Sequence, residues 1–265
     1  MARPPFPHTV NLQFAIPAWA ACGPGLSTPA QWQAWSTAPG LPSGEPQPAL
    51  AQVPPMVRRR LNTLGRTALQ AAFDVDAAPG VPVVFASRYG DSGRGLDLLG
   101  DLVRGEPLSP TGFGLAVHNA IAATYAIVRG DHASQQAVAA GPDSAVAALV
   151  EAAGLLADGA PEVLVLYAEG PLPPDYAVFE DEPSALYAWA WRVCAPVAGA
   201  PAFTLQYGEV PDLPEVSDPP DASPVPPALP VLPAGLDLLR VVAAPDAASA
   251  HRRRPAPWTW RRHHA

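Results

Sequence analysis

The segment 134–170, SQQAVAAGPDSAVAALVEAAGLLADGAPEVLVLYAEG, has the pattern with which α/β enzymes present a nucleophile. It predicts a short apolar strand, a sharp turn, an Ala-rich helix, a loop and a buried strand. The turn is Ala-Gly-Pro-Asp-Ser, so Gly141 and Pro142 stand where acyl transfer needs a thiol, hydroxyl or carboxylate. Asp143 and Ser144 follow at the expected helix start, where they suit a cap or a charge on the helix dipole. A nucleophilic role for Ser144 is the alternative.

Few other side chains could complete an acyl-transfer site. All sixteen basic residues are arginine, and the six histidines are His8, His118, His132, His251, His263 and His264. None of these histidines lies in a His-Gly-Thr or Gly-His-Thr setting, and there is no Gly-x-Ser-x-Gly motif. A hydrolase or acyltransferase that combines Ser144 or Asp143 with His118 or His132 is therefore a second hypothesis. His118 could also be a hydrogen-bonded histidine of the core.

Arginines form two clusters. The first is Arg58, Arg59 and Arg60, followed by Arg66. On one continuous helix over 54–73, Arg59 and Arg66 would share a face, which could be solvated and internally paired or could dock an acidic partner. The second cluster, at 252–254 and 261–262 with Trp258 and Trp260, could dock a partner or pack the terminus onto the domain.

Metal and disulfide chemistry have little support in the sequence. His263 and His264 lack convergent carboxylates or thiolates, so we expect no metal site. Cys22 and Cys194 have neither pairing nor ligand spacing and are expected to be reduced thiols.

The composition is that of a globular protein. Of 265 residues, 49% are hydrophobic and 15% charged, and the net charge of −8 argues against a general nucleic-acid binder. No apolar run reaches the ~18 residues of a membrane span. Because no targeting segment is evident either, we expect a cytoplasmic protein. The thirty-six prolines cluster near both ends and indicate extended peripheral segments there.

Strands and helices alternate along the chain. Before the opening segment we expect strands over 10–16 and 81–86, helices over 28–36, 54–73 and 95–103, and a buried central helix from 110. After it we expect a helix over 182–194, a strand over 200–208, a Pro-rich connector over 209–233 and a helix from 235. This alternation predicts an α/β fold with a mixed, largely parallel sheet covered by helices on both faces. The expected units are a domain over 8–210, a linker over 211–234 and a C-terminal helix and tail over 235–265.

Three blocks in this order resemble β-ketoacyl-ACP synthases. RRLNTLGRTALQAA resembles their Arg-rich helix, and LSPTGFGLAVHNAIAATYAIVRGD resembles their Ser-Pro turn and buried helix, with Asn119 at the family's Asn. QAVAAGPDSAVAALVEAAGLLADGAPEVLVLYAEG resembles the strand, elbow, helix and strand around their nucleophile. The resemblance spans 53–170 and is strongest to the short proteins that look like chain-length factors of aryl-polyene pathways, whose C-terminal end resembles WTWRRHHA. It implies a thiolase-like half with an irregular Pro-rich C-terminal extension.

The resemblance implies that the catalytic machinery is lost. The family's nucleophilic cysteine falls at Pro142, or at Gly141 if the alignment slips by one residue. The family's second half, with two catalytic histidines and a lysine, has no counterpart here. We therefore expect no catalytic residue and no cofactor.

The resemblance also implies partners. The strand over 134–140, with Gln136 and Val138, would pair across a dimer two-fold axis with a catalytic ketosynthase. The helix over 110–125 would line that subunit's acyl tunnel, through Phe113, Leu115, Val117 and His118. The apolar members of this set could equally be ordinary core. The helix with Arg58, Arg59, Arg60 and Arg66 would dock an acyl carrier protein.

These inferences predict a non-catalytic subunit resembling a chain-length factor in polyene or fatty-acid-like biosynthesis. The alternatives are the independent acyl hydrolase or transferase that uses Ser144, and a scaffold that binds carrier proteins without altering the product.

Overall fold

The computed structural model describes residues 10–46, 48–207, 231–246, 248–252 and 257–263. Most of the expected connector over 209–233, and of the linker over 211–234, lies outside these residues.

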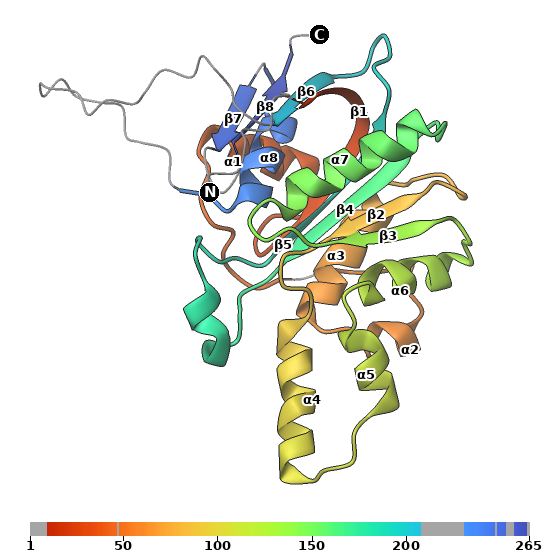
Figure 1. Cartoon of the computed structure of the whole chain (residues 1–265), viewed down its shortest axis with the longest axis vertical. Coiled ribbons are helices and arrows are strands. Elements are labelled where there is room, and N and C mark those ends of the chain that lie inside the picture. Colours follow the sequence, from red (N-terminus) through yellow and green to blue (C-terminus); the bar gives the residue numbers. More distant parts are fainter. Residues whose placement is uncertain (1–9, 47, 208–230, 247, 253–256, 264–265) are drawn as a thin grey trace, which may run out of the picture.

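One eight-stranded sheet organises the described chain (Figure 1). Its order is β3-β2-β4-β5-β1-β6-β8-β7. The strands are β1 (Val10–Cys22), β2 (Val83–Ala86), β3 (Gln135–Val138), β4 (Val163–Glu169), β5 (Tyr187–Cys194), β6 (Ala202–Tyr207), β7 (Ala248–Arg252) and β8 (Trp258–Arg262). Strands β3, β2 and β4 are parallel, and all other neighbours are antiparallel. The mixed sheet is confirmed, but it is not largely parallel.

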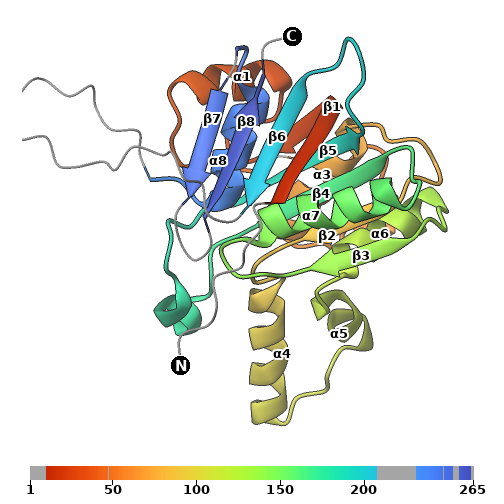
Figure 2. The same cartoon turned by 45° about the horizontal axis from the view of Figure 1, so that its top comes forward.

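Helices cover both faces of the sheet, as expected (Figure 2). The face with α3 (Thr63–Asp74) and α6 (Ala120–Arg129) buries Phe85 and Leu166, among others. The opposite face, with α1 (Pro29–Thr37), α7 (Ser144–Ala157) and α8 (Ala234–Ala243), buries a larger aromatic core. Because the central strands are covered on both sides, nearly all of their side chains are buried and apolar.

Strand β1 joins two parts of the sheet. Its residues 15–22 pair with β5, and its residues 10–15 pair with β6. The register shifts between Ala15 and Ala18, and Pro17, which has no N–H for the ladder, lies within this irregularity. This strand is longer than the one expected over 10–16.

The prediction of one continuous helix over 54–73 is wrong. Helix α2 (Pro55–Arg58) ends after one turn, and α3 starts anew where the Asn62 side chain accepts a hydrogen bond from the Gly65 N–H at 3.0 Å. Arg59 and Arg60 therefore lie on the connection, and Arg59 does not share a helix face with Arg66.

The buried central helix expected from residue 110 is two helices. Val117 has extended dihedral angles (φ −70°, ψ 147°) and separates α5 (Pro110–Ala116) from α6. Helix α5 instead packs beside α4 (Ser92–Arg104) and buries none of its residues. We call residues 92–116 the arm; Figure 1 shows it projecting from the body.

Among the described helices, none is by itself long and apolar enough to cross a membrane. Helices α5 and α6 reach that length and composition only together, with a bend of 107° between them.

The helix expected over 182–194 is also wrong, because strand β5 occupies Tyr187–Cys194. Its aromatic residues alternate with alanines, and this period of two sends Trp189 and Trp191 to one face and Ala188 and Ala190 to the other. Alanine favours helices, but here it lets α3 approach the sheet closely.

The C-terminal region packs onto the sheet. Trp258 and Trp260 of β8 are fully buried, and the Trp260 ring stacks on Phe203 at 5.1 Å between centroids. At the start of α8, Gly235 lies against Tyr167 and Tyr187, and its carbonyl accepts a hydrogen bond from Trp189 Nε1 at 3.0 Å. The sequence left two alternatives for the tail, docking a partner or packing onto the domain. Trp258 and Trp260 pack onto the domain.

Candidate functional site

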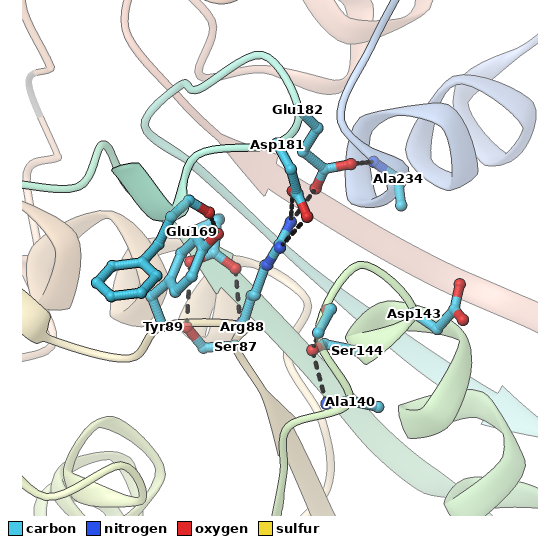
Figure 3. Close-up of polar contacts among 12 residues, drawn as sticks. Ser87, Arg88, Tyr89, Ala140, Asp143, Ser144, Glu169, Asp181, Glu182 and Ala234 are labelled. Carbon is cyan, nitrogen blue, oxygen red and sulfur yellow. Dashed lines mark hydrogen bonds and ion pairs between the residues drawn. The ribbon is translucent and has the colours of Figure 1, made fainter. Parts of the chain in front are cut away.

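The candidate site lies at the carboxyl ends of the three parallel strands. The elbow, residues 140–144, follows β3; the turn of residues 87–90 follows β2; and Glu169 ends β4 (Figure 3). Ligands of α/β proteins bind at this edge of a parallel sheet. The sheet therefore brings the elbow beside groups distant in sequence.

The elbow has the backbone of a nucleophile turn, but its one hydroxyl is occupied. Gly141 has φ +58°, a left-handed conformation that favours glycine. Ser144 is fully buried; its Oγ donates to the Gly141 carbonyl at 2.7 Å and accepts from the Ala140 N–H at 2.9 Å. Ser144 therefore fastens the elbow to the start of α7.

The carboxylate of Asp143 turns away from the elbow tip. It makes no side-chain capping bond to α7, contrary to one expectation, and its Oδ1 accepts from Trp258 Nε1 at 3.3 Å. Asp143 thus connects the elbow to β8.

A groove of about 650 Å³ lies beside the elbow. Its lining includes Arg88, Tyr89, Ser92 and Gly141. The rest of the lining comes from residues 171–186, which we call the strap. The strap contains the 3-10 helix η1 (Pro174–Phe179) and contributes Leu172, Tyr176, Val178, Phe179 and Asp181 to the groove. The groove is thus mostly apolar, with one ion pair between Arg88 and Asp181 at 2.5 Å.

Glu169 is a buried carboxyl that the sequence analysis missed. Its Oε2 accepts from the Arg88 backbone N–H at 2.8 Å and from the Tyr167 hydroxyl at 3.1 Å. Burial raises the pKa of Glu169 to about 7, although these hydrogen bonds oppose the shift. The only signal in the sequence was a single acidic residue ending the otherwise apolar strand VLVLYAE.

The residues predicted for a tunnel or partner interface lie on α5, on the connection between α5 and α6, and on β3. Phe113 and Val117 are exposed on or beside the arm (67% and 45%), whereas Leu115, Gln136 and Val138 are half-buried. Gln136 and Val138 belong to β3, which is the edge strand of the sheet, as expected. The described lining of the elbow groove includes none of these five residues.

His118 is hydrogen-bonded and packed. Its Nε2 lies 2.8 Å from the Ser87 carbonyl, which can only accept, so this nitrogen carries the proton. Its ring packs on Phe85 with 5.6 Å between centroids. His118 is therefore a hydrogen-bonded, packed histidine, which is one of the two interpretations that the sequence allowed.

Two of the four arginines bond to nearby backbone. Arg58 Nη1 donates to the Ala49 carbonyl at 3.0 Å, and Arg66 Nε donates to the Leu61 carbonyl at 3.2 Å. Arg59 and Arg60 are exposed. Arg58 and Arg66 are half-buried. Within the described part of the chain, no group of three or more His, Cys, Asp or Glu residues could hold a metal ion.

Solved structures with similar folds include complexes that contain a ketosynthase. A chain from the complex of the ketosynthase ApeO with its chain length factor ApeC, from Xenorhabdus doucetiae, is 26% identical with a TM-score of 0.75, and 94% of this chain covers 99% of it. The ishigamide ketosynthase/chain length factor gives 20% identity and a TM-score of 0.57, with 73% of this chain covering 65% of the matched one.

A third similar structure is AntDE:AntF, an acyl-carrier protein in complex with its ketosynthase, at 10% identity and a TM-score of 0.56. There, 75% of this chain covers 70% of the matched chain. No curated protein matches the sequence.

These likenesses agree with a thiolase-like ketosynthase fold, which the sequence resemblance implied. A family model described as beta-ketoacyl synthase, N-terminal domain, matches residues 32–261. This match covers most of the chain, which therefore belongs to the family of beta-ketoacyl synthase N-terminal domains.

Proposed function

We propose that this chain is a non-catalytic, chain-length-factor-like subunit that pairs with a complete β-ketoacyl-ACP synthase in polyene or fatty-acid-like biosynthesis. The elbow carries this proposal. It keeps the strand, turn and helix of a nucleophile site, but Pro142 stands at the tip and the Ser144 hydroxyl is held by Gly141 and Ala140. A partner subunit would supply the thiol and the histidines for the Claisen condensation. The similarity to a chain of a ketosynthase–chain length factor complex supports this assignment.

Two exposed features of the chain, the edge strand β3 and the apolar side chains of α4, are suited to an interface with a ketosynthase. Strand β3 leaves one edge of the sheet without a neighbouring strand among the described residues. The arm presents Leu99, Leu102 and Val103 of α4 to solvent, with 53%, 59% and 87% exposed. Open strand edges and apolar patches are costly on a free monomer and typical of an interface. In the complex the arm, with Phe113, would line the partner's acyl tunnel, and Arg59 and Arg60 would contribute to the carrier-protein dock.

Co-expression with the full-length ketosynthase encoded in the same genome tests this proposal. We expect a one-to-one heterodimer by size exclusion and native mass spectrometry, whereas the chain alone should self-associate. A well-behaved monomer that binds no ketosynthase would refute the pairing.

Replacing Ser144 with Ala separates this function from an independent acyltransferase. We expect neither wild type nor Ser144→Ala to accept an acyl group from an acyl-carrier thioester, as measured by intact mass. The variant should lose about 1–2 kcal/mol of stability, because the Ala140 N–H loses its acceptor. Acylation of the wild-type chain alone that Ser144→Ala abolishes would instead support the hydrolase or transferase hypothesis.

Replacing Phe113 with Ala tests the tunnel role. Its side chain is 67% exposed, so the stability of the chain should change by less than about 0.5 kcal/mol. In the heterodimer, a shorter side chain should let the acyl chain grow further, so the product distribution measured by mass spectrometry should shift to longer chains. Met56→Ala on α2 is the matched control, because Met56 is 69% exposed. An unchanged product in an intact heterodimer would favour the carrier-protein scaffold.

A further inference from the structure

The turn of residues 87–90 lies where three parts of the chain meet. Toward the strap, the Tyr89 hydroxyl donates to the Phe179 carbonyl at 2.8 Å, and the Arg88 guanidinium pairs with Asp181. Toward the arm, the turn leads directly into α4, and the Ser87 carbonyl accepts the His118 Nε2 proton just after α5. The turn therefore anchors the strap and both ends of the arm.

The Glu169 carboxyl is hydrogen-bonded to this turn (Figure 3). Its Oε2 accepts the Arg88 N–H, and its Oε1 lies 3.5 Å from the Ser87 Oγ, which in turn accepts the Gly90 N–H at 2.9 Å. The Glu169 side chain reaches these groups from β4, 81 and 82 residues away in sequence. Only 8% of Glu169 is exposed, so the closed turn keeps its carboxyl out of water.

We infer that Glu169 is a positioning residue whose buried carboxyl closes the turn of residues 87–90, and that ionisation of this carboxyl releases the turn together with the strap and the base of the arm. The inference concerns the chain itself and does not rest on the proposed function. In a heterodimer it would make the placement of the arm sensitive to pH.

The groups around Glu169 determine the direction of the effect. Burial is the largest cause and raises its pKa to about 7, and the negative charge of Glu182 on the strap acts in the same direction. The backbone N–H groups of Arg88 and Tyr89 and the Tyr167 hydroxyl oppose the shift. Charged and titratable neighbours on the packed elements also include the Arg88 guanidinium and Asp181, and Tyr187 on β5. The His118 Nε2–H donates to Ser87 whether or not the other ring nitrogen is protonated.

Because the closed and released forms of the turn bind the Glu169 proton with different affinities, their relative populations depend on pH. In the released turn Glu169 would be hydrated, with an ordinary pKa of about 4.3. Between that value and about 7, the closed form holds a proton that the released form has lost. Rising pH therefore favours release by up to about tenfold per unit in this window, or about 40-fold from pH 5 to pH 7, and the effect levels off above it.

Hydrogen exchange of the full chain between pH 5 and pH 8 tests the inference. After correction for intrinsic exchange rates, peptides from the turn, the strap and both ends of the arm should lose protection together, by about 40-fold between pH 5 and pH 7. In Glu169→Gln, which cannot ionise, protection should be independent of pH. Glu162→Gln is the matched control, since Glu162 precedes β4 at its other end and pairs with Arg192 at 2.8 Å. This variant should keep the wild-type pH dependence.

Tyr89→Phe tests the connection between the turn and the strap. It also provides a second test of the inference if Glu169→Gln does not fold. Without the hydroxyl that reaches Phe179, the strap should exchange faster at every pH, while the turn and arm keep the wild-type titration. Wild-type protection that does not change with pH would overturn the inference, as would the same titration in Glu169→Gln. Because no partner is needed, absence of the heterodimer leaves this test unaffected.

Discussion

Replacing Val103 with Asp is expected to weaken the proposed heterodimer strongly while leaving the monomer folded. Val103 is 87% exposed on α4, beside Leu99 and Leu102, so an aspartate there is fully hydrated in the free chain. In the complex the same carboxylate would lie unpaired in an apolar interface, at a cost of at least about 3 kcal/mol. Affinity for the ketosynthase should therefore fall by about 100-fold or more, measurable by titration with the purified partner.

The control for Val103→Asp is Val178→Asp on the strap, because Val178 is 84% exposed and the change in chemistry is identical. Val178→Asp should bind normally. Both variants should unfold within about 1 kcal/mol of wild type, including the unfavourable charge near the end of α4 in Val103→Asp. Equal losses of affinity in both variants, or a normal complex with Val103→Asp, would contradict the role of the arm.

Replacing Gly235 with Ala should strongly destabilise the fold. An added Cβ would lie 2.5 Å from both Tyr167 Cε1 and the Tyr187 hydroxyl oxygen, and both tyrosines are buried. The first turn of α8 would have to move away, which would also weaken the hydrogen bond from Trp189 Nε1. We expect a loss of about 3 kcal/mol in the free energy of unfolding, measured by urea denaturation followed by tryptophan fluorescence.

Gly154→Ala provides the matched comparison, since Gly154 lies within α7 and, apart from the adjacent residues and the backbone of α7 itself, no heavy atom lies within 4 Å of its added Cβ. This variant should gain about 0.5–1 kcal/mol, because alanine restricts the unfolded chain and favours the helix. If Gly235→Ala unfolds at the wild-type urea concentration, α8 does not pack as tightly on the tyrosines as described.

Local patterns predicted the region around the elbow well. The strand, turn, helix and strand over 134–170 follow from apolar spacing and from a glycine that can adopt φ +58°. The incorrect predictions concern two helices that a single residue interrupts and one strand whose residue pattern is mixed. Asn62 starts a new helix, and the extended Val117 breaks another. In β5, aromatic residues alternate with alanine, a strand pattern that contains a residue type favouring helices.

The polar network of the site could not be predicted from spacing. Glu169 reaches Arg88, and Arg88 reaches Asp181, across 81 and 93 residues. Such contacts form only because β2 and β4 are neighbours in the sheet and because the strap passes close to Arg88. The spacing of apolar residues along the sequence predicts neither of these features. Conversely, the sequence identified Ser144 correctly as a helix-start residue, but only the fold shows that the elbow backbone occupies its hydroxyl.

The pairing of β1 has a consequence for how the protein folds during synthesis. β1 is the first described strand to leave the ribosome, yet its partners β5 and β6 begin only at Tyr187 and Ala202. Until then the strand must stay unpaired, whereas β2, β3 and β4 can assemble with their helices earlier. Contacts so distant in sequence slow folding and prolong the exposure of apolar strands. Nascent chains of this protein should therefore depend on chaperones until β6 has emerged.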